Sequence, residues 1–584
     1  MTMKFLLIDR TYKIYFISFN RICVTKCIFP TQNNNRYYAA KPDIVSYNTV
    51  MYSYAFNQSD EYDSTEEVLR IFNKLKEQCN NDDNDDKSNN NQLKYDSKLQ
   101  PNVVTLNILL RCFAKSGQAD RAKNMLDEME AAYQSGSKQM SPDTLTFNTV
   151  IDAFAKSKQP EEAEEVLKQM MVISREEPER EEDIKADTIS FNTVLHAWQT
   201  SGRHGAALRA QQLLDHMTKL YHAGNDNVKP DAYSYAVTMS AWSAEKRHPK
   251  SLEKTMELLH KMQNSCALGD DDLCPNTIAY TAAINALARS GRAGAANQAY
   301  DILLEMDKQS REGNDDLKPD FICYSAVIDA LAKSEEESAG ERALNLVNHM
   351  VTLTEMGYEN MRPNSQVYLS VITALGKSKA RGSADTAQKL LNDMERCYAL
   401  GDTNVAPNTI IFNAVIHAWA LSSFVYKADR AYMLMKRMED KAKEDSESKC
   451  QPDIITYNSV ILAAANSFGD SKIKKKAFRL ALIAFKTIMA SSNLRQSSRT
   501  YAMFLKAIRK LNKRGAETDE MVKKVFRACC RDGLLNQYVL TQTQLSFTSK
   551  NVFQETLANM GCSNHSVLDL KHLPEEWQTN AGRD

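Results

Sequence analysis

The chain has 584 residues, and its 73 Lys and Arg against 74 Asp and Glu leave a net charge close to zero. This balance excludes a protein that binds nucleic acid through bulk charge alone, so any basic surface must be local. Twelve cysteines without a C-x-x-C pair argue against a structural zinc site and favour reduced thiols, and no apolar stretch reaches the about 20 residues that a membrane helix needs.

The first 41 residues form a basic leader, in which seven Lys or Arg face the single acid Asp9. A basic N-terminus that is poor in acids is typical of the transit peptides that direct proteins to mitochondria or plastids. We therefore interpret residues 1–41 as a transit peptide and slightly favour the mitochondrion. An ordinary unstructured N-terminus or a misassigned start is the alternative.

After the leader, a Pro-Asp or Pro-Asn pair recurs along the chain and opens a similar stretch each time, such as PDTLTFNTVIDAFAKSKQPEEAEEVLKQM from Pro142. From Asp143 onward its second residue returns about every 44 residues, at Asp187, Asp231, Asn276, Asp320, Asn364, Asn408 and Asp453. A period in this range is typical of solenoids built from stacked repeats, and it argues against a single enzyme core.

The first half of each repeat has the pattern of an amphipathic helix, which we call helix A. In the quoted repeat its apolar stripe is Phe147, Val150, Ile151, Phe154 and Ala155. Asp143 precedes this stripe at the position of an N-cap, where a carboxylate accepts the free backbone N–H groups of the first turn.

The second half of the repeat predicts another helix, helix B. Pro160 suits the first helical position, and the acidic residues Glu161 and Glu162 suit a helix N-terminus. The apolar spacing then continues at Ala163, Val166, Leu167 and Met170. Polar segments rich in Gly, Asn and Asp connect helix B to the next repeat and are predicted to be loops.

Neither helix can bury its stripe alone, so the hairpins must stack. We expect an all-α protein, a right-handed superhelical α-solenoid of about ten to eleven helix-turn-helix repeats with an inner groove. The expected divisions are a leader (1–41), the repeat solenoid (42–497, with a disordered insert at 80–92), a degenerate last repeat with capping helices (498–545) and a C-terminal tail (546–584).

The order P-D-x-x-T-Y-N-T-V-I, then A-K-S-G, then x-x-A-x-x-x-L-x-x-M resembles the pentatricopeptide repeat family, from about Ile44 to Met489 with a weaker unit from Ser498. The resemblance implies a solenoid that binds single-stranded RNA in organelles at about one base per repeat. Family repeats are usually about 35 residues long, whereas these are longer by acidic loops, which we expect to face away from the RNA.

The resemblance also implies which residues contact the bases, namely the fifth residue of helix A and the last residue before the next helix A. The fifth residue is Asn48, Asn107, Asn148, Asn192, Asn413 and Asn458 in six repeats, Thr281 and Ser325 in two, and Ala236 and Leu369 in the remaining two. The partners of the first eight are, in the same order, Asn102, Asp143, Asp187, Asp231, Asp453, Ser497, Asp320 and Asn364. In chain order, the family's code translates these pairs into an RNA sequence close to (C/U)-U-U-U-x-G-A-x-U-C, in which x marks the repeats of Ala236 and Leu369.

The residue chemistry fits such a role, because an amide offers both a donor and an acceptor to a base edge whereas Ala236 and Leu369 offer only contact area. A polar filler is the alternative for each Asn, although Asn is a poor helix former away from the cap. For the terminal Asp or Asn, N-capping alone explains the residue type, and only the choice between the two remains open.

Five basic residues lie near the end of helix A at one register and predict a ladder of cations for the RNA phosphates. They are Lys115, Lys156, Arg289, Lys333 and Lys377. Each alone is also explained as a helix-end charge that the dipole stabilises. Two tryptophans, Trp198 and Trp419, recur at an apolar register of helix A, which favours core packing over base stacking.

Signatures of catalysis are missing from the sequence. No His-x-Glu or C-x-x-C of a zinc deaminase occurs, and the C-terminal tail has few acidic residues, so we assign it the role of a cap. We therefore expect no enzymatic activity, no metal and no cofactor, and a protein that acts on an organellar transcript by occupying single-stranded RNA. The alternative is a protein-binding scaffold that uses the acidic loops.

Overall fold

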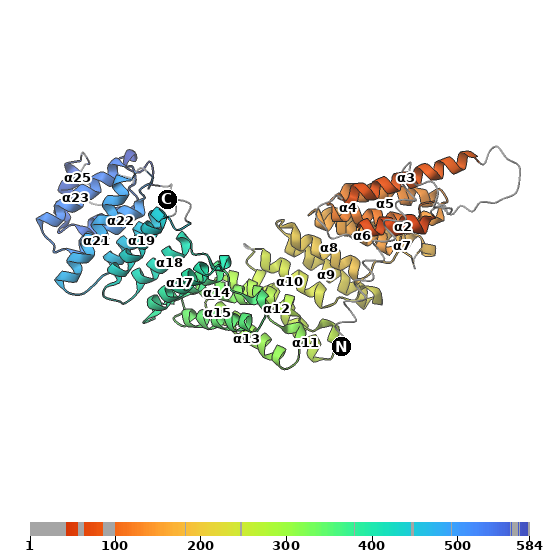
Figure 1. Cartoon of the computed structure of the whole chain (residues 1–584), viewed down its shortest axis with the longest axis horizontal. Coiled ribbons are helices and arrows are strands. Elements are labelled where there is room, and N and C mark those ends of the chain that lie inside the picture. Colours follow the sequence, from red (N-terminus) through yellow and green to blue (C-terminus); the bar gives the residue numbers. More distant parts are fainter. Residues whose placement is uncertain are drawn as a thin grey trace. The chain divides into compact units, whose positions relative to one another are not determined.

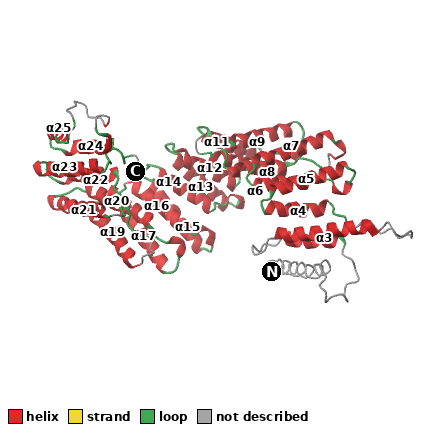
Figure 2. Ribbon diagram, turned by 90° about the horizontal axis from the view of Figure 1, so that it is seen from above, coloured by secondary structure: helices red, strands yellow, loops and turns green. Residues whose placement is uncertain are grey.

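The chain is described here by a computed structural model. It describes residues 43–55, 64–85, 100–180, 183–245, 248–378, 380–444, 449–491, 493–560, 562, 570 and 573–581. In this part of the chain all regular structure is helical, as Figure 2 shows, which confirms the all-α class and the helical-repeat solenoid. The predicted leader at 1–41 lies outside the described residues.

Helices alternate along the chain as the repeats predict. Helix A of successive hairpins is α2 (Ile44–Ala55), α4 (Val103–Lys115), α6 (Thr144–Lys156), α8 (Thr188–Ser201), α10 (Ala232–Ala244), α12 (Thr277–Ser290), α14 (Phe321–Lys333), α16 (Ser365–Ser378), α18 (Thr409–Leu421), α20 (Ile454–Ala465) and α22 (Ser498–Leu511). Helix B is α3 (Ser64–Asp85), α5 (Ala119–Gln134), α7 (Pro160–Glu176), α9 (Ala206–His222), α11 (Ser251–Ala267), α13 (Ala295–Arg311), α15 (Ala339–Glu355), α17 (Ser383–Ala399), α19 (Lys427–Glu444), α21 (Ser471–Ala490) and α23 (Ala516–Arg531). Two further helices, α24 (Gln537–Ser546) and α25 (Lys550–Ala558), follow.

The quoted repeat shows why these elements form. Asp143 caps α6 as predicted, because its carboxylate accepts the backbone N–H of Thr146 at 2.7 Å. Helix α7 begins at Pro160, where a missing N–H costs nothing. The predicted apolar stripes of both helices, Phe147 and Met170 among them, are buried. Burial at about 25 cal/mol per Å² of apolar surface makes these stripes the main source of stability.

The described part of the solenoid divides into two compact units, with the boundary between Ala286 and Leu287. In the first, α4, α6, α8 and α10 pack in succession, each against the next helix A (Figure 1). In the second, the same succession runs through α14, α16, α18, α20, α22 and α24. Each helix A in these runs also contacts helices B, which buries the apolar stripes on both sides.

The acidic loops that lengthen the repeat are folded segments. Gly224 ends α9 in the left-handed region with φ of 99°, and a 3₁₀ turn, η3 (Asp226–Val228), then buries Val228 completely. Corresponding turns follow other helices B, namely η4 (Asp271–Leu273), η5 (Asp315–Leu317), η6 (Glu359–Met361) and η7 (Thr403–Val405). The hydroxyl of Thr188 donates to the carbonyl of Lys229 at 2.8 Å and so ties the loop to the first residue of helix A.

Neighbouring loops also neutralise one another. Lys229 pairs with Asp270 at 3.1 Å and Asp272 at 2.7 Å, and Arg362 pairs with Asp402 at 3.1 Å. In each unit, ion pairs thus join a couple of neighbouring loops, which gives a physical reason for keeping the additional residues.

Three features differ from the sequence-based expectations. Helix α3 extends to Asp85, so the first part of the segment at 80–92 is helical, where we predicted disorder, and residues 86–92 lie outside the described part. Cys266 and Cys274 form a disulfide across the end of α11, which corrects the expectation that the thiols are reduced. Residues 546–584, expected to be a tail, contain α25, and the backbone N–H of Leu535 donates to the carbonyl of Trp577 at 2.8 Å.

Candidate nucleic-acid interface

The structure brings the fifth residue of helix A next to the cap of the following helix A. We call each such couple a reading pair. In five of them the side-chain Nδ2 of the asparagine donates to the cap: Asn48 to Asn102 (3.4 Å), Asn107 to Asp143 (3.3 Å), Asn148 to Asp187 (3.4 Å), Asn192 to Asp231 (3.2 Å) and Asn413 to Asp453 (3.0 Å). Residues about 40 positions apart in sequence thus form one polar unit between adjacent repeats.

The remaining predicted positions are arranged differently. Thr281 Oγ1 donates to the carbonyl of Thr277 in its own helix, and Ser325 Oγ and Asn458 Oδ1 are buried without a hydrogen-bond partner. The side chain of Ala236 is fully buried. The predicted partners Asp320, Asn364 and Ser497 are the caps of α14, α16 and α22, because each accepts a backbone N–H of the first turn.

The reading pairs are held firmly yet remain accessible. The exposed fraction is 8% for Asn192 and 7% for Asn413, whereas their partners Asp231 and Asp453 are half-buried. Asp143 and Asp453 make their cap and pair bonds through Oδ1. Oδ2 of each carboxylate is therefore the atom that can accept a hydrogen bond from a ligand in the groove.

A row of exposed apolar side chains accompanies the pairs, and the sequence analysis missed it. It occupies the second residue of helix A, three positions before the fifth, so that both lie on the same helix face. The row consists of Val45, Val104, Leu145, Ile189, Tyr233, Ile278, Ile322, Ile410 and Ile455. Single exposed apolar residues need no explanation, but six at one register in the first unit and three in the second give each unit an apolar surface. The sequence signal was an apolar residue at this register outside the buried stripe.

In the second unit, side chains of the apolar row and of the reading pairs line one hollow, whose volume is about 390 Å³. Its lining includes the fifth residues Leu369, Asn413 and Asn458 and the second residues Ile410 and Ile455. A flat ring can lie against the aliphatic side chains there while its edge meets an amide.

The five predicted cations, Lys115, Lys156, Arg289, Lys333 and Lys377, are all exposed at the end of helix A. Two of them are partly neutralised inside their own helix, because Lys156 pairs with Asp152 at 2.6 Å and Lys333 pairs with Asp329 at 2.5 Å. The last hairpin adds Lys510 at the same register, and this residue too is exposed. The sequence analysis left it out because that repeat is degenerate.

Positive charge is concentrated around Lys510. Burial together with the charges of Lys510 and Arg509 lowers the pKa of Lys506 below its ordinary value. Burial and the charge of Arg499 likewise lower the pKa of His417, which lines the hollow described above. An anion bound beside Lys510 or in the hollow would reduce the repulsion among these positive charges.

Trp198 and Trp419 pack in the core, as predicted. Only 8% of Trp198 and 1% of Trp419 is exposed, and each indole N–H donates inward, to Glu164 at 3.2 Å and to Gln388 at 2.8 Å. The described residues contain no cluster of His, Cys, Asp and Glu that could hold a metal ion. Among them, no helix is both long and apolar enough to cross a membrane.

A family model described as "PPR repeat" matches residues 97–130 and 138–171, which contain the hairpins α4–α5 and α6–α7. These two hairpins are pentatricopeptide repeats (PPR). They confirm, at the level of the repeat, the resemblance predicted from the sequence.

Among solved structures, the chain is similar to the crystal structure of the pentatricopeptide repeat protein PPR10 from maize, at 15% identity over 93% of this chain and 80% of that chain. The TM-score of this match is 0.29. No curated protein matches the chain.

Proposed function

We propose that this protein binds one segment of single-stranded RNA along its helices A and selects it by sequence. The observation that carries the proposal is the row of reading pairs, in which an amide and a carboxylate meet beside an exposed apolar side chain in repeat after repeat. Single-stranded RNA is the ligand that presents base edges and base faces at a regular spacing.

Within this proposal, the family's code assigns a base to each reading pair. Asn with Asp favours uracil, Thr281 with Asp320 favours guanine, and Ser325 with Asn364 favours adenine. Asn with Asn or Ser favours a pyrimidine. The exposed cations at the ends of helices A contact the phosphates.

We infer further from the basic leader that the protein acts in a mitochondrion or plastid, and we slightly favour the mitochondrion. Occupying an RNA segment can block a nuclease, open a hairpin or expose a start site, and none of these outcomes needs a catalytic group. We therefore propose a role in transcript processing, stabilisation or translation without catalysis.

The cation ladder provides the test. Changing Lys115, Lys156, Arg289, Lys333 and Lys377 together to Ala should lower RNA affinity at least about 100-fold, and should lower the salt slope by about 0.7 per cation lost. Filter binding at several stated salt concentrations measures both quantities, and circular dichroism checks that helicity is kept. Unaltered binding by the folded variant would refute RNA binding along this face.

The alternative is a protein-binding scaffold, favoured by the stack of folded acidic loops and the balanced net charge. It predicts that the ladder variant keeps its partner. Changing Asp270, Asp272 and Asp402 to Asn should then abolish partner binding, whereas RNA binding along the groove should be unaffected or slightly improved.

A further inference from the structure

The third residue of helix A varies together with the fifth residue of the preceding repeat. After each of Asn48, Asn107, Asn148, Asn192, Asn413 and Asn458, the next helix A has a hydroxyl at its third position, namely Thr105, Thr146, Ser190, Ser234, Thr456 and Thr500. After Ala236, Thr281, Ser325 and Leu369, the third residue is Ala279, Cys323, Val367 and Ile411. None of these four carries a hydroxyl.

Burial cannot explain this pattern, because the third residue is buried in both groups. The exposed fraction is 0% for Thr146 and Thr456 and equally 0% for Cys323 and Ile411. An apolar side chain is therefore well tolerated at this position, and the hydroxyl in six repeats needs a partner that justifies its burial.

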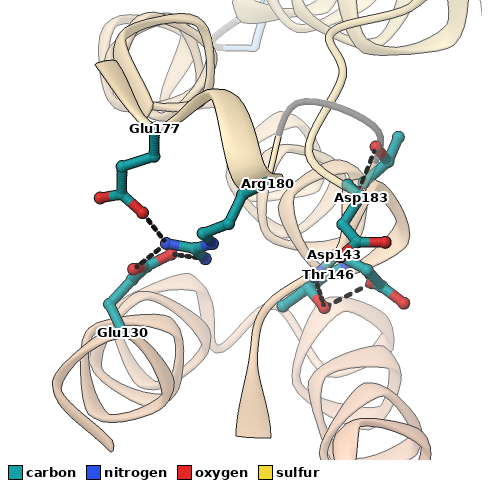
Figure 3. A network of polar contacts seen from close by, with 7 residues as sticks. Glu130, Asp143, Thr146, Glu177, Arg180 and Asp183 are labelled. Atoms are coloured by element: carbon teal, nitrogen blue, oxygen red, sulfur yellow. Dashed lines mark hydrogen bonds and ion pairs between the residues drawn. The ribbon is translucent and has the colours of Figure 1, made fainter. Parts of the chain in front are cut away.

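The hydroxyl has two partners. One is the cap of its own helix, whose Oδ1 lies between 2.6 Å (Thr146) and 3.0 Å (Thr105) from the hydroxyl oxygen in a capping box. The other is the amide oxygen of the reading pair. Oγ lies at hydrogen-bond distance from the Asn Oδ1 in four repeats: Thr105 to Asn48 (2.8 Å), Thr146 to Asn107 (2.8 Å), Ser234 to Asn192 (2.6 Å) and Thr456 to Asn413 (2.6 Å). The same hydroxyl accepts the backbone N–H of the cap, at 3.1 Å for Thr146 and Asp143, which Figure 3 shows side by side.

Two of the six repeats lack this bond. Asn148 Oδ1 and Asn458 Oδ1 are buried without a partner, although Ser190 and Thr500 follow them. The hydroxyl of Ser190 lies 2.8 Å from Asp187, and that of Thr500 lies 3.3 Å from Ser497. The other four hydroxyls are equally close to their caps, so these two repeats differ only in lacking the approach to the amide oxygen.

Physical chemistry links the three residues. The cap carboxylate repels the amide oxygen and attracts Nδ2, so it sets the direction of the amide. The oxygen then faces the interior, where it needs a donor, and a buried amide oxygen without one costs about 1–3 kcal/mol. A hydroxyl at the third position supplies that donor, whereas an alanine, valine or isoleucine cannot.

We propose that the third residue of the following helix A is a positioning residue for base selection: its hydroxyl fixes the fifth-residue amide so that Nδ2 and the cap carboxylate face the base. This inference rests on the proposed RNA binding. A base preference then depends on three residues from two adjacent repeats, and the repeats with an apolar third residue are built for fifth residues other than asparagine.

Loss of the hydroxyl is tested at Thr146. The full-length variants Thr146→Val and Thr146→Ser are compared with the unmodified chain on RNAs that differ only in the nucleotide facing Asn107. Discrimination among the four bases should fall about fivefold in Thr146→Val, the value of one hydrogen bond, and should be kept in Thr146→Ser. Unchanged discrimination in a folded Thr146→Val chain would overturn the inference.

Gain of the hydroxyl is tested at Leu369, because a loss variant could fail to fold. Leu369→Asn is made alone, with Ile411→Thr, and with Ile411→Val, which matches threonine in shape without the hydroxyl. Only the combination with Ile411→Thr should create a pyrimidine preference at this repeat, by about fivefold. Equal preference in the threonine and valine combinations would contradict the inference.

The two experiments separate this inference from the proposed function. If the unmodified chain discriminates bases but the hydroxyl variants behave like their valine counterparts, only the positioning role fails. If the unmodified chain binds RNA without any discrimination, or does not bind it, base reading fails and the positioning role fails with it.

Discussion

Helices A and helices B of this solenoid contact their neighbours through different chemistry. Helices A meet at half-buried hydrogen bonds among an amide, a carboxylate and a hydroxyl, such as Asn192, Asp231 and Ser234. Helices B meet at charged contacts, such as Arg209 on α9 with Glu164 on α7, and Arg437 on α19 with Glu395 on α17. Strong ion pairs therefore stabilise the contacts between helices B. The weaker hydrogen bonds between helices A leave polar atoms that a ligand can reach.

The strongest test of the helix-B side is Arg180, whose guanidinium is 2% exposed. It contacts Glu130 of α5 at 3.0 Å, Glu177 at 3.0 Å and the ring of Tyr133, as Figure 3 shows for the two carboxylates. Arg180→Ala removes the partner of the buried carboxylate of Glu130 and should cost about 4 kcal/mol of unfolding free energy.

Denaturant unfolding measures this loss. Arg203→Ala is the matched control, because its pair with Glu161 is about half exposed and should contribute less than about 1 kcal/mol. Base discrimination should be unchanged in both variants. If Arg180→Ala kept its helicity but lost base discrimination, the proposed separation between a stabilising helix-B side and a base-reading helix-A side would be wrong.

Glu164 should show a pH-dependent effect of intermediate size. Burial alone would raise the pKa of Glu164, but hydrogen bonds and charge from Arg209 and Lys168 outweigh it, so the pKa lies below its ordinary value. A carboxyl whose pKa is lowered on folding stabilises the protein above the ordinary carboxyl pKa, and this contribution disappears as the pH falls through the lowered value.

Glu164→Gln should therefore cost about 2 kcal/mol at neutral pH and progressively less in acid. Thermal unfolding between pH 7 and pH 3 measures the difference from the unmodified chain. Glu165→Gln, which changes an exposed carboxylate on the same helix, is the control and should show little difference. A constant difference at every pH would show that the lowered pKa is not its cause.

On the helix-A side, Asn107→Ala should reduce discrimination at one nucleotide by about tenfold, because a bidentate amide contact is lost. Stability should fall by only about 1 kcal/mol, since the bond to Asp143 is long at 3.3 Å and the Thr146 hydroxyl, which loses its 2.8 Å contact with Asn107, keeps Asp143 as an acceptor. Asn297→Ala is the matched control: this helix-B asparagine accepts a hydrogen bond from Arg342, and its loss should affect stability alone. Competition binding with RNAs that differ at one position measures the discrimination.

The smallest effect is expected at Asp152, which partly neutralises Lys156 of the ladder. Asp152→Asn should raise RNA affinity about twofold, because an exposed pair of this kind is worth only about 0.3–0.5 kcal/mol. The control is Asp127→Asn, which removes the same type of pair with Lys123 on helix B. Equal effects of both variants would indicate a general charge effect.

The sequence predicted the helices, their caps and their buried stripes well, because these depend on local spacing, as Asp143 and Phe147 illustrate. Local spacing alone could not predict which cap meets which fifth residue, since that depends on how repeats stack; the family resemblance implied these couples, and five of them form hydrogen bonds. The folded loops were not predicted from the sequence. The loop at Val228 buries one apolar residue, and a single residue gives no periodic pattern to recognise. The role of Thr146 was hidden because its residue type is also explained by capping.

The most direct test of base reading is a selection of RNA sequences from a random pool by the purified full-length chain at near-physiological salt. The reading pairs predict single-stranded RNAs with a uracil-rich block followed two positions later by guanine and adenine. Asp320→Asn should then shift the guanine towards adenine. The contrary result is a pool without enrichment and binding that vanishes with modest salt, which would show that the asparagines and their caps serve only to hold the helices together.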